Sequence, residues 1–241
     1  MHLRVAEEIW SAFPGLHLGV VIARGIDNSG DASELAAAIR EAQSLIRAEY
    51  ESETLSQIPR FQAWRRAFSD FGSKPKKYKS SVESLYRMVI KGTDLRRISP
   101  VVDIYNLVSL KFGIPAGGDD LDKVRGDICL TFAAGGEEFI PLNSETREEA
   151  RPGEVIYRDE QGVLCRRWNW RECDRTKMTR DTRHVSLVVE ALPPVERAEV
   201  EVIVTELAGL VSGICGGVVR SAVLDRSHPD IRMDREPDMG G

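Results

Sequence analysis

The sequence lacks the features that would place the chain in or across a membrane. No apolar run approaches the roughly 18–20 residues that span a bilayer. The N-terminal segment, MHLRVAEEIW, carries acids where a secretion signal needs an unbroken apolar region. These absences predict a cytoplasmic protein without a membrane partner.

Metal-binding and common catalytic signatures are also missing. The four cysteines include no CxxC pair, and the four histidines are scattered without an HExxH motif. We interpret the cysteines as reduced, mostly buried thiols. There is no GxSxG elbow, no Walker loop and no GxGxxG after a strand. We therefore expect no metal site and no cofactor.

The composition is that of a globular protein. The 241 residues are 42% hydrophobic and 29% charged, which is enough for a sizeable core without cross-links. The net charge of -5 argues against a chain coated by nucleic acid, but it leaves room for a local basic patch.

Hydrophobic spacing predicts helices mainly in the first half of the chain and strands mainly in the second. We expect helices at 33–50, from 59 onward, at 80–92, 100–112 and 195–214, and strands at 16–22, 127–133, 137–142, 154–159, 163–170 and 184–192. This segregation indicates an α+β fold, with helices flanking a mixed or antiparallel sheet. We expect an N-terminal extension at 1–14, one domain at 15–225, and a disordered tail at 226–241 that is rich in charge, Pro and Gly.

The most basic stretch of the chain is 74–97. Four lysines crowd a loop that contains Pro75, and two arginines follow the next helix; the lysines are Lys74, Lys76, Lys77 and Lys79. The stretch has two interpretations. It is either a solvated face or a surface on which RNA phosphates bind electrostatically.

A second unusual segment is LCRRWNWRECDRT, at 164–176. Read as a strand of period two, it places Leu164, Arg166, Trp168 and Trp170 on one face, and Val163, Cys165, Arg167 and Asn169 on the other. Neither face is cleanly apolar. Stacking rings, cationic donors and an amide suit the wall of a small-ligand site, with Asp174 and Thr176 in the turn beyond. The alternative is an exposed strand with Arg–Trp stacking.

Two further segments carry a family resemblance. LRRISPVVDIYNLVSLKFGIPAGGDDLDKVRG, at 95–126, and DRTKMTRDTRHVSLVVEAL, at 174–192, resemble the B3/B4 domain of the phenylalanyl-tRNA synthetase β subunit. In that family the first segment has an N-x-V-D-x-T-N helix, and the second has a Thr-x-x-Thr-x-x-Val-x-Leu pattern before a final acid. The WNW-containing form is similar to free-standing B3/B4 proteins. The resemblance spans roughly 15–224.

The resemblance implies an editing module that hydrolyses the ester of a wrongly attached amino acid. The family's helix Asp and Asn match Asp103 and Asn106, and its Thr is Tyr105 here. Its pocket His falls at Gly117, and its glycine-rich strand is replaced by CRRWNWRE. In the family that amino acid is tyrosine on the phenylalanine tRNA, and these departures mean that the specificity for tyrosine does not carry over. The candidate general bases are Asp103, Asp174 and Glu190.

Three hypotheses follow. In the first, the chain is a trans-acting enzyme that deacylates a mischarged aminoacyl-tRNA, whose acceptor end meets the lysines. Its predicted catalytic residues are Asp103, Asn106 and Asp174, and its ligand-binding residues are Tyr105, Arg166, Arg167, Trp168, Asn169, Trp170, Thr176 and Glu190. The second hypothesis is a non-catalytic module that binds an amino acid or a related small molecule. The third is an RNA-binding module. Nothing resembles an ATP-binding synthetase core, so we do not expect a complete tRNA ligase.

Overall fold

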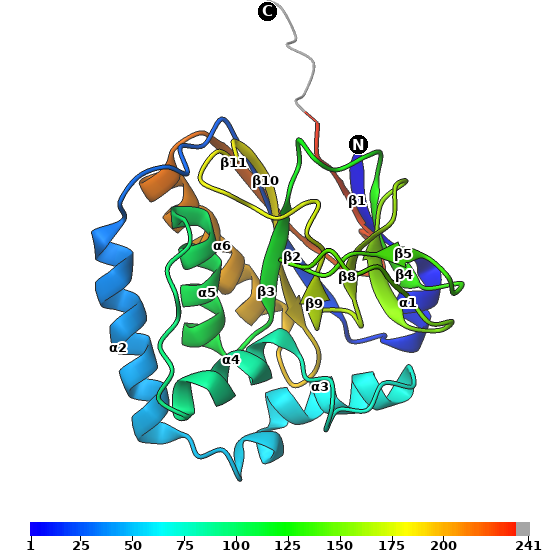
Figure 1. Ribbon diagram of the computed structural model, residues 1–241, viewed down its shortest axis with the longest axis horizontal. Coiled ribbons are helices and arrows are strands. Elements are labelled where there is room, and N and C mark those ends of the chain that lie inside the picture. Colours follow the sequence, from blue (N-terminus) through cyan, green and yellow to red (C-terminus); the bar gives the residue numbers. More distant parts are fainter. Residues whose placement is uncertain (235–241) are drawn as a thin grey trace, which may run out of the picture.

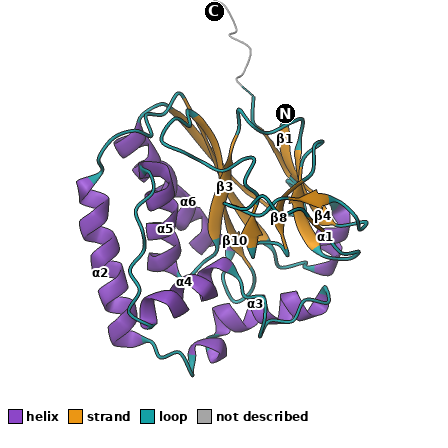
Figure 2. Ribbon diagram, in the orientation of Figure 1, coloured by secondary structure: helices purple, strands orange, loops and turns teal. Residues whose placement is uncertain are grey.

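Two β-sheets lie side by side, and helices gather on the outer face of one of them (Figures 1 and 2). The computed structural model describes residues 1–234. The helices are α1 (Glu7–Ala12), α2 (Ser33–Glu49), α3 (Pro59–Asp70), α4 (Ser81–Ile90), α5 (Pro100–Phe112) and α6 (Arg197–Cys215), with a short 3₁₀ turn at Leu55–Gln57. Among residues 1–234, no helix is both long and apolar enough to cross a membrane.

The strands form one mixed sheet, one antiparallel sheet and a small hairpin. The strands are β1 (His2–Val5), β2 (His17–Arg24), β3 (Ala116–Asp120), β4 (Ile128–Phe132), β5 (Glu138–Phe139), β6 (Glu148–Glu149), β7 (Val155–Arg158), β8 (Val163–Arg166), β9 (Arg171–Glu172), β10 (His184–Ala191), β11 (Val218–Leu224) and β12 (Asp230–Arg232). The six-stranded sheet has the order β12-β1-β4-β7-β8-β9, and the four-stranded sheet has the order β11-β2-β10-β3. Within residues 1–234, β1 and β4 pair in parallel, and the other strand pairs of these two sheets are antiparallel. The predicted α+β class is confirmed.

Strand β2 divides the interior into two cores. Leu18, Val20 and Ile22 pack toward the six-stranded sheet, whereas Val21 and Ala23 belong to the other core, on the side covered by α6. Side chains alternate along a strand, so a strand buried on both faces reads as a continuous apolar run. Strand β10 alternates in the same way. Its even-numbered residues therefore face the six-stranded sheet.

Helix α5 carries the predicted start and stop signals. Pro100 occupies the first turn, and Gly113 ends the helix with a φ of 60°. Pro is preorganised for a first helical turn, and Gly adopts the left-handed conformation without strain. These signals set the bounds of α5, which packs against β3.

Strand β3 is absent from the predicted elements, because Pro115, Gly117 and Gly118 are residues that usually interrupt regular structure. Instead, β3 pairs antiparallel with β10 at the edge of the four-stranded sheet. A Cβ built on Gly118 would lie 2.2 Å from the carbonyl oxygen of Ser186. The glycine thus permits a close backbone approach, which is a common reason for Gly within a strand.

The six-stranded sheet includes residues 2–5 and 230–232, and the latter correct part of the expected tail. Strand β12 pairs with β1, with Leu3 opposite Ile231. The Met1 ammonium bonds the Asp234 carboxylate at 2.8 Å. The expected extension forms β1 and α1, and its Trp10 is buried in the core. Residues 235–241 of the expected tail lie outside the described residues.

Candidate functional site

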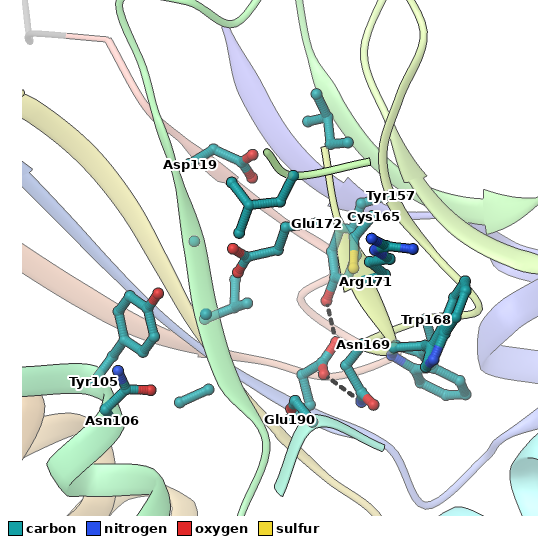
Figure 3. Close-up of a pocket in the computed structure, with 18 of the residues that line it drawn as sticks. Tyr105, Asn106, Asp119, Tyr157, Cys165, Trp168, Asn169, Arg171, Glu172 and Glu190 are labelled. Carbon is teal, nitrogen blue, oxygen red and sulfur yellow. Dashed lines mark hydrogen bonds between the residues drawn. The ribbon is translucent and has the colours of Figure 1, made fainter. Parts of the chain in front are cut away.

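A cavity of about 340 Å³ lies between the two sheets, where β3 faces β8 and β9 (Figure 3). Its walls come from α5, β3, β8, β9, β10 and the turn between β8 and β9. A volume of this size suits one small ligand group. The cavity brings together segments that lie far apart in the sequence.

Glu190 is the most deeply buried acid of the cavity. This residue of β10 is 2% exposed and faces the six-stranded sheet. Its Oε1 accepts a hydrogen bond from the Tyr157 hydroxyl at 2.6 Å, and its Oε2 accepts one from Asn169 Nδ2 at 2.6 Å. Burial raises the pKa of Glu190 to about 7, although both hydrogen bonds favour the ionised form. A carboxyl that titrates near neutrality can take a proton from a bound water.

Two further acids line the same cavity. Burial and the nearby Asp119 raise the pKa of Glu172, on β9, to about 7. Burial raises the pKa of Asp119, on β3, to about 6, while the Thr176 hydroxyl lowers it by donating to Oδ1 at 2.5 Å. Like charges in a shared low-dielectric site disfavour ionisation of each. Perturbed acids gathered in a cavity are typical of functional sites.

Three polar atoms of the cavity wall make no regular hydrogen bond to any residue in 1–234. They are Ser81 Oγ, Asn169 Oδ1 and Trp168 Nε1. The Trp168 indole lies near Glu190 and favours its ionised form. Buried polar groups are nearly always paired in native structures. Ser81 Oγ and Asn169 Oδ1 are therefore available to bind a ligand in the cavity.

Cys165 also lines the cavity but is a poor nucleophile. Burial, followed by the charges of Glu172, Glu190 and Asp119, raises the pKa of its thiol well above the usual value. A thiol attacks only as the thiolate. The chemistry of the cavity therefore rests on its carboxyl and amide groups.

The turn after β8 sets the shape of the cavity floor. Arg167 and Trp168 both have left-handed backbones, with φ of 47° and 65°. Tertiary packing holds this conformation: the Trp168 N–H donates to the Val155 carbonyl at 2.6 Å. Its ring meets those of Phe13 and Trp64 edge-on, at centroid distances of 4.7 and 5.0 Å. Strained backbone held by surrounding structure is frequent at functional sites.

Comparison with known proteins identifies the family. The model of the B3/4 domain matches residues 63–216. The chain belongs to the B3/4 domain family.

Relatives of this B3/4 chain are tRNA ligase subunits. It is 36% identical over 75 residues to the phenylalanine–tRNA ligase beta subunit of Leifsonia xyli, covering 31% of this chain and 9% of that protein. It is 27% identical over 169 residues to the same subunit of Mycolicibacterium paratuberculosis, covering 59% of this chain and 20% of that protein. The chain thus spans at most a fifth of these two relatives. An N-terminal fragment of the Pyrococcus horikoshii phenylalanyl-tRNA synthetase beta subunit has a TM-score of 0.46 and 14% identity, covering 90% of this chain and 49% of that one.

At Gly117 the wall of the cavity has no side chain, whereas the resemblance places a histidine at this position. A Cβ built on Gly117 would lie 2.8 Å from Glu172 Oε1. The missing side chain therefore leaves the space that the Glu172 carboxyl reaches.

The predicted alternation of the 164–176 segment is wrong beyond Arg166, where β8 ends. The turn at Arg167 and Trp168 breaks the period of two. As a result, Trp168, Asn169 and Trp170 all line the cavity, although they are consecutive. No local pattern specifies this turn, because the aromatic cluster around Trp168 comes from distant segments.

Arg166 and Arg167, which were predicted to bind a ligand, instead form contacts within the protein. Arg166 forms a bidentate pair with Glu154, at 3.0 and 2.8 Å, and a further bond to Glu148 at 2.7 Å. Arg167 pairs with the same Glu154 at 2.9 Å and stacks 3.8 Å above the Tyr78 ring. Neither arginine lines the cavity.

Asp103 and Asp174 lie outside the cavity, which corrects the predicted catalytic set. The Asp103 carboxylate accepts from Arg97 Nε at 3.0 Å and from the Ile98 N–H at 3.1 Å, near the start of α5. Asp174 pairs with Lys177 at 2.8 Å, and that contact lowers its pKa. Both acids are already occupied by structural contacts.

The neighbours of Asp103 on α5 do reach the cavity. Tyr105 and Asn106 line it, facing β3. Asn106 makes no side-chain hydrogen bond to any other residue in 1–234, so its amide is available to a ligand. Thr176 lies just behind the wall, where it donates to Asp119.

The lysine loop between α3 and α4 reaches the rim of the cavity through Tyr78. The Tyr78 ring packs edge-on against Trp170 at 4.8 Å, and Ser81, at the start of α4, lines the cavity. Lys79 is half-buried, whereas the exposed lysines are Lys74, Lys76 and Lys77. The loop therefore presents positive charge next to the part of the wall that Trp170 and Ser81 form.

The sequence prediction omitted Asp119, Glu172 and Tyr157. Asp119 and Glu172 both lie outside the predicted strands, which end at 170 before Glu172 and include no segment around Asp119. Recognising β3 as a strand would have placed Asp119 opposite Ser186 of β10.

Within residues 1–234, no group of three or more His, Cys, Asp or Glu side chains is arranged to hold a metal ion.

Proposed function

We propose that this chain is an aminoacyl-tRNA deacylase, which hydrolyses the ester between an amino acid and the tRNA acceptor end. The observation that carries the proposal is Glu190, a carboxyl buried in the cavity whose pKa is raised to about 7. Membership of the B3/4 family and the relation to tRNA ligase beta subunits support an aminoacyl-tRNA as the substrate.

Glu190 is the general base in this proposal. Its carboxylate takes a proton from a water molecule, and the water oxygen adds to the ester carbonyl carbon. The tetrahedral intermediate then breaks its bond to the ribose oxygen, to which the protonated Glu190 returns the proton. The products are a free amino acid and deacylated tRNA.

Glu190 retains the capacity to bind that water. Each of its oxygens accepts one hydrogen bond, from Tyr157 and from Asn169. An ionised carboxylate has about four acceptor sites, so sites remain for a water proton. The two existing bonds hold the carboxylate in place, which reduces reorganisation during the reaction.

The side-chain amides on either side of Glu190, those of Asn106 and Asn169, bind the aminoacyl group. Asn106 Nδ2 donates to the carbonyl oxygen, where negative charge develops in the transition state. Asn169 has its Nδ2 committed to Glu190, so its unpaired Oδ1 accepts from the α-ammonium group. Asn106 and Asn169 lie on opposite sides of Glu190 in Figure 3.

The lysine loop supplies the contact to tRNA. The exposed side chains of Lys74, Lys76 and Lys77 meet the phosphates of the acceptor end while the ester enters the cavity. The Tyr78–Trp170 contact keeps the loop beside the entrance.

A non-catalytic amino acid-binding module is the second candidate. It is favoured by the hydrogen bonds that Tyr157 and Asn169 donate to the two oxygens of Glu190, because they leave fewer acceptor sites for a catalytic water. The two candidates make opposite predictions for turnover.

Deacylation of a panel of purified aminoacyl-tRNAs tests the proposal. We expect the rate for at least one amino acid to exceed the spontaneous rate, and Glu190→Gln to lower it about 10²–10⁴-fold, the usual contribution of a general base. Glu41→Gln is the matched control, because Glu41 is exposed on α2. Spontaneous rates across the whole panel, with binding of free amino acids, would favour the second candidate.

A further inference from the structure

None of the three acids of the cavity is in direct contact with a cation of residues 1–234, although the charge of Arg175 acts on Asp119 and lowers its pKa. Among residues 1–234, no ion pair involves Asp119, Glu172 or Glu190. The arginine that lines the cavity, Arg171, is exposed and lies over the Trp170 ring. Buried carboxyl groups are normally paired, because desolvation of an unpaired charge is costly. The three carboxyl groups therefore line the cavity without an ion-pair partner among residues 1–234.

The acids are spread along the cavity rather than clustered at one point. Asp119 lies opposite Ser186 on β10, four residues from Glu190. At roughly 3.3 Å per residue, this separates the two backbone positions by about 13 Å. Gly117 lies opposite Val188, between these positions, and the Glu172 carboxyl extends toward it. Figure 3 shows Glu190 and Asp119 toward opposite ends, with Glu172 between them.

Register places these groups on one face. Residues two apart on a strand point to the same side, so Gly117 and Asp119 share the cavity face of β3. The Tyr105 ring, which is 9% exposed, stands beside this part of the cavity. Its pKa is raised well above the usual value by burial and then by the Glu172 charge. The far part of the cavity is thus acidic and lined by the largely buried Tyr105 ring.

We propose that the amino acid accepted by this cavity has a positively charged side chain, of the lysine or ornithine class. The inference rests on the proposed function and names its substrate class. The α-ammonium and ester lie at the Glu190 end, beside Asn106 and Asn169. The side-chain cation extends to Glu172 and Asp119, where it supplies the missing counter-charge.

A neutral side chain would leave these acids unpaired. An aliphatic chain offers them no donor, and a phenol offers one hydroxyl to two carboxyl groups. Sites whose buried polar groups are left unpaired by the wrong ligand discriminate strongly against it. We therefore expect cationic ligands to bind at least about 100-fold more tightly than neutral ligands of the same length.

Calorimetric titration with amino acid amides tests the inference, because an amide mimics the ester without being readily hydrolysed. The full chain is titrated with lysinamide and with norleucinamide, which keeps the four-carbon side chain but lacks its ammonium. We expect Glu172→Gln and Asp119→Asn each to reduce the lysinamide preference at least about tenfold, while Glu41→Gln leaves it unchanged. Equal or tighter binding of norleucinamide or tyrosinamide overturns the inference.

The deacylation panel separates this inference from the proposed function. Turnover confined to neutral aminoacyl-tRNAs would leave the deacylase standing and overturn the cationic substrate. Preference for lysinamide without turnover of any tRNA would retain the cationic ligand and overturn the deacylase. Faster turnover of lysyl-tRNA than of the neutral esters, with the preference reduced by Glu172→Gln, supports both.

Discussion

Glu190 illustrates how one side chain acquires a chemical role from its surroundings. On β10 it occupies a position that faces the six-stranded sheet, where Val188 is the previous inward-facing residue. Burial raises its pKa, and Tyr157 and Asn169 offset part of that cost. A carboxyl that remained at an ordinary pKa would be a weaker base.

The pH dependence of deacylation tests this role at the residue scale. A general base works in its ionised form, so the rate above the spontaneous reaction should rise through about pH 7 and then level off. Below that pKa we expect about a tenfold fall per pH unit. Single-turnover assays with Glu190→Gln as the reference measure it. Parallel profiles for the wild type and the variant would contradict the assignment.

At the element scale, the sequence predicted helices better than it predicted the site. The helix α5 follows from local signals, namely Pro100 at its start and Gly113 at its end. Strand β2 follows from its apolar run, which is buried on both faces. Asn106 and Glu190 were identified through the family resemblance, and both line the cavity.

The elements that the sequence did not predict depend on distant partners. Strand β3 forms because Gly118 allows close contact with β10, which neither segment reveals alone. The left-handed turn at Trp168 is fixed by rings such as Phe13, more than 150 positions away in the chain. Local propensity cannot anticipate such tertiary contacts.

The lysine loop permits a test at the same scale. Replacing Lys74, Lys76 and Lys77 together with Ala should weaken tRNA binding and reduce the slope of log affinity against log salt by about 2, since each phosphate contact contributes roughly 0.7–0.9. The turnover rate at saturating tRNA should stay unchanged, because these lysines lie outside the cavity. Arg40→Ala, an exposed cation on α2, is the control. An unchanged salt slope in the triple variant would remove the loop from the tRNA contact.

At the scale of the whole molecule, the cavity lies between the two sheets and holds three acids whose ionisation opposes folding. The four-stranded sheet contributes Asp119 and Glu190, and the six-stranded sheet contributes Glu172. All three have raised pKa values in the folded state, with burial as the first cause. Functional sites commonly retain groups that oppose folding.

Stability should therefore depend on pH in a direction set by these acids. Between their ordinary pKa values and about 7, the unfolded chain has ionised while the folded chain keeps the protons. The protonated acids thus add to the free energy of unfolding in full at low pH, and this addition is lost as the pH rises through about 7. For Glu190 alone, the shift from 4.5 to about 7 corresponds to about 3 kcal/mol.

Glu190→Gln isolates this contribution from the other titrating groups. The variant cannot ionise at this position, so its free energy of unfolding should fall less than that of the wild type between about pH 5 and about pH 8. Urea unfolding at both pH values measures the difference, with Glu41→Gln expected to match the wild type. Identical pH dependence in Glu190→Gln would show that the buried carboxyl does not titrate with folding. Saturating lysinamide should reduce the wild-type loss at high pH, because the ligand cation binds the ionised cavity more tightly than the protonated one.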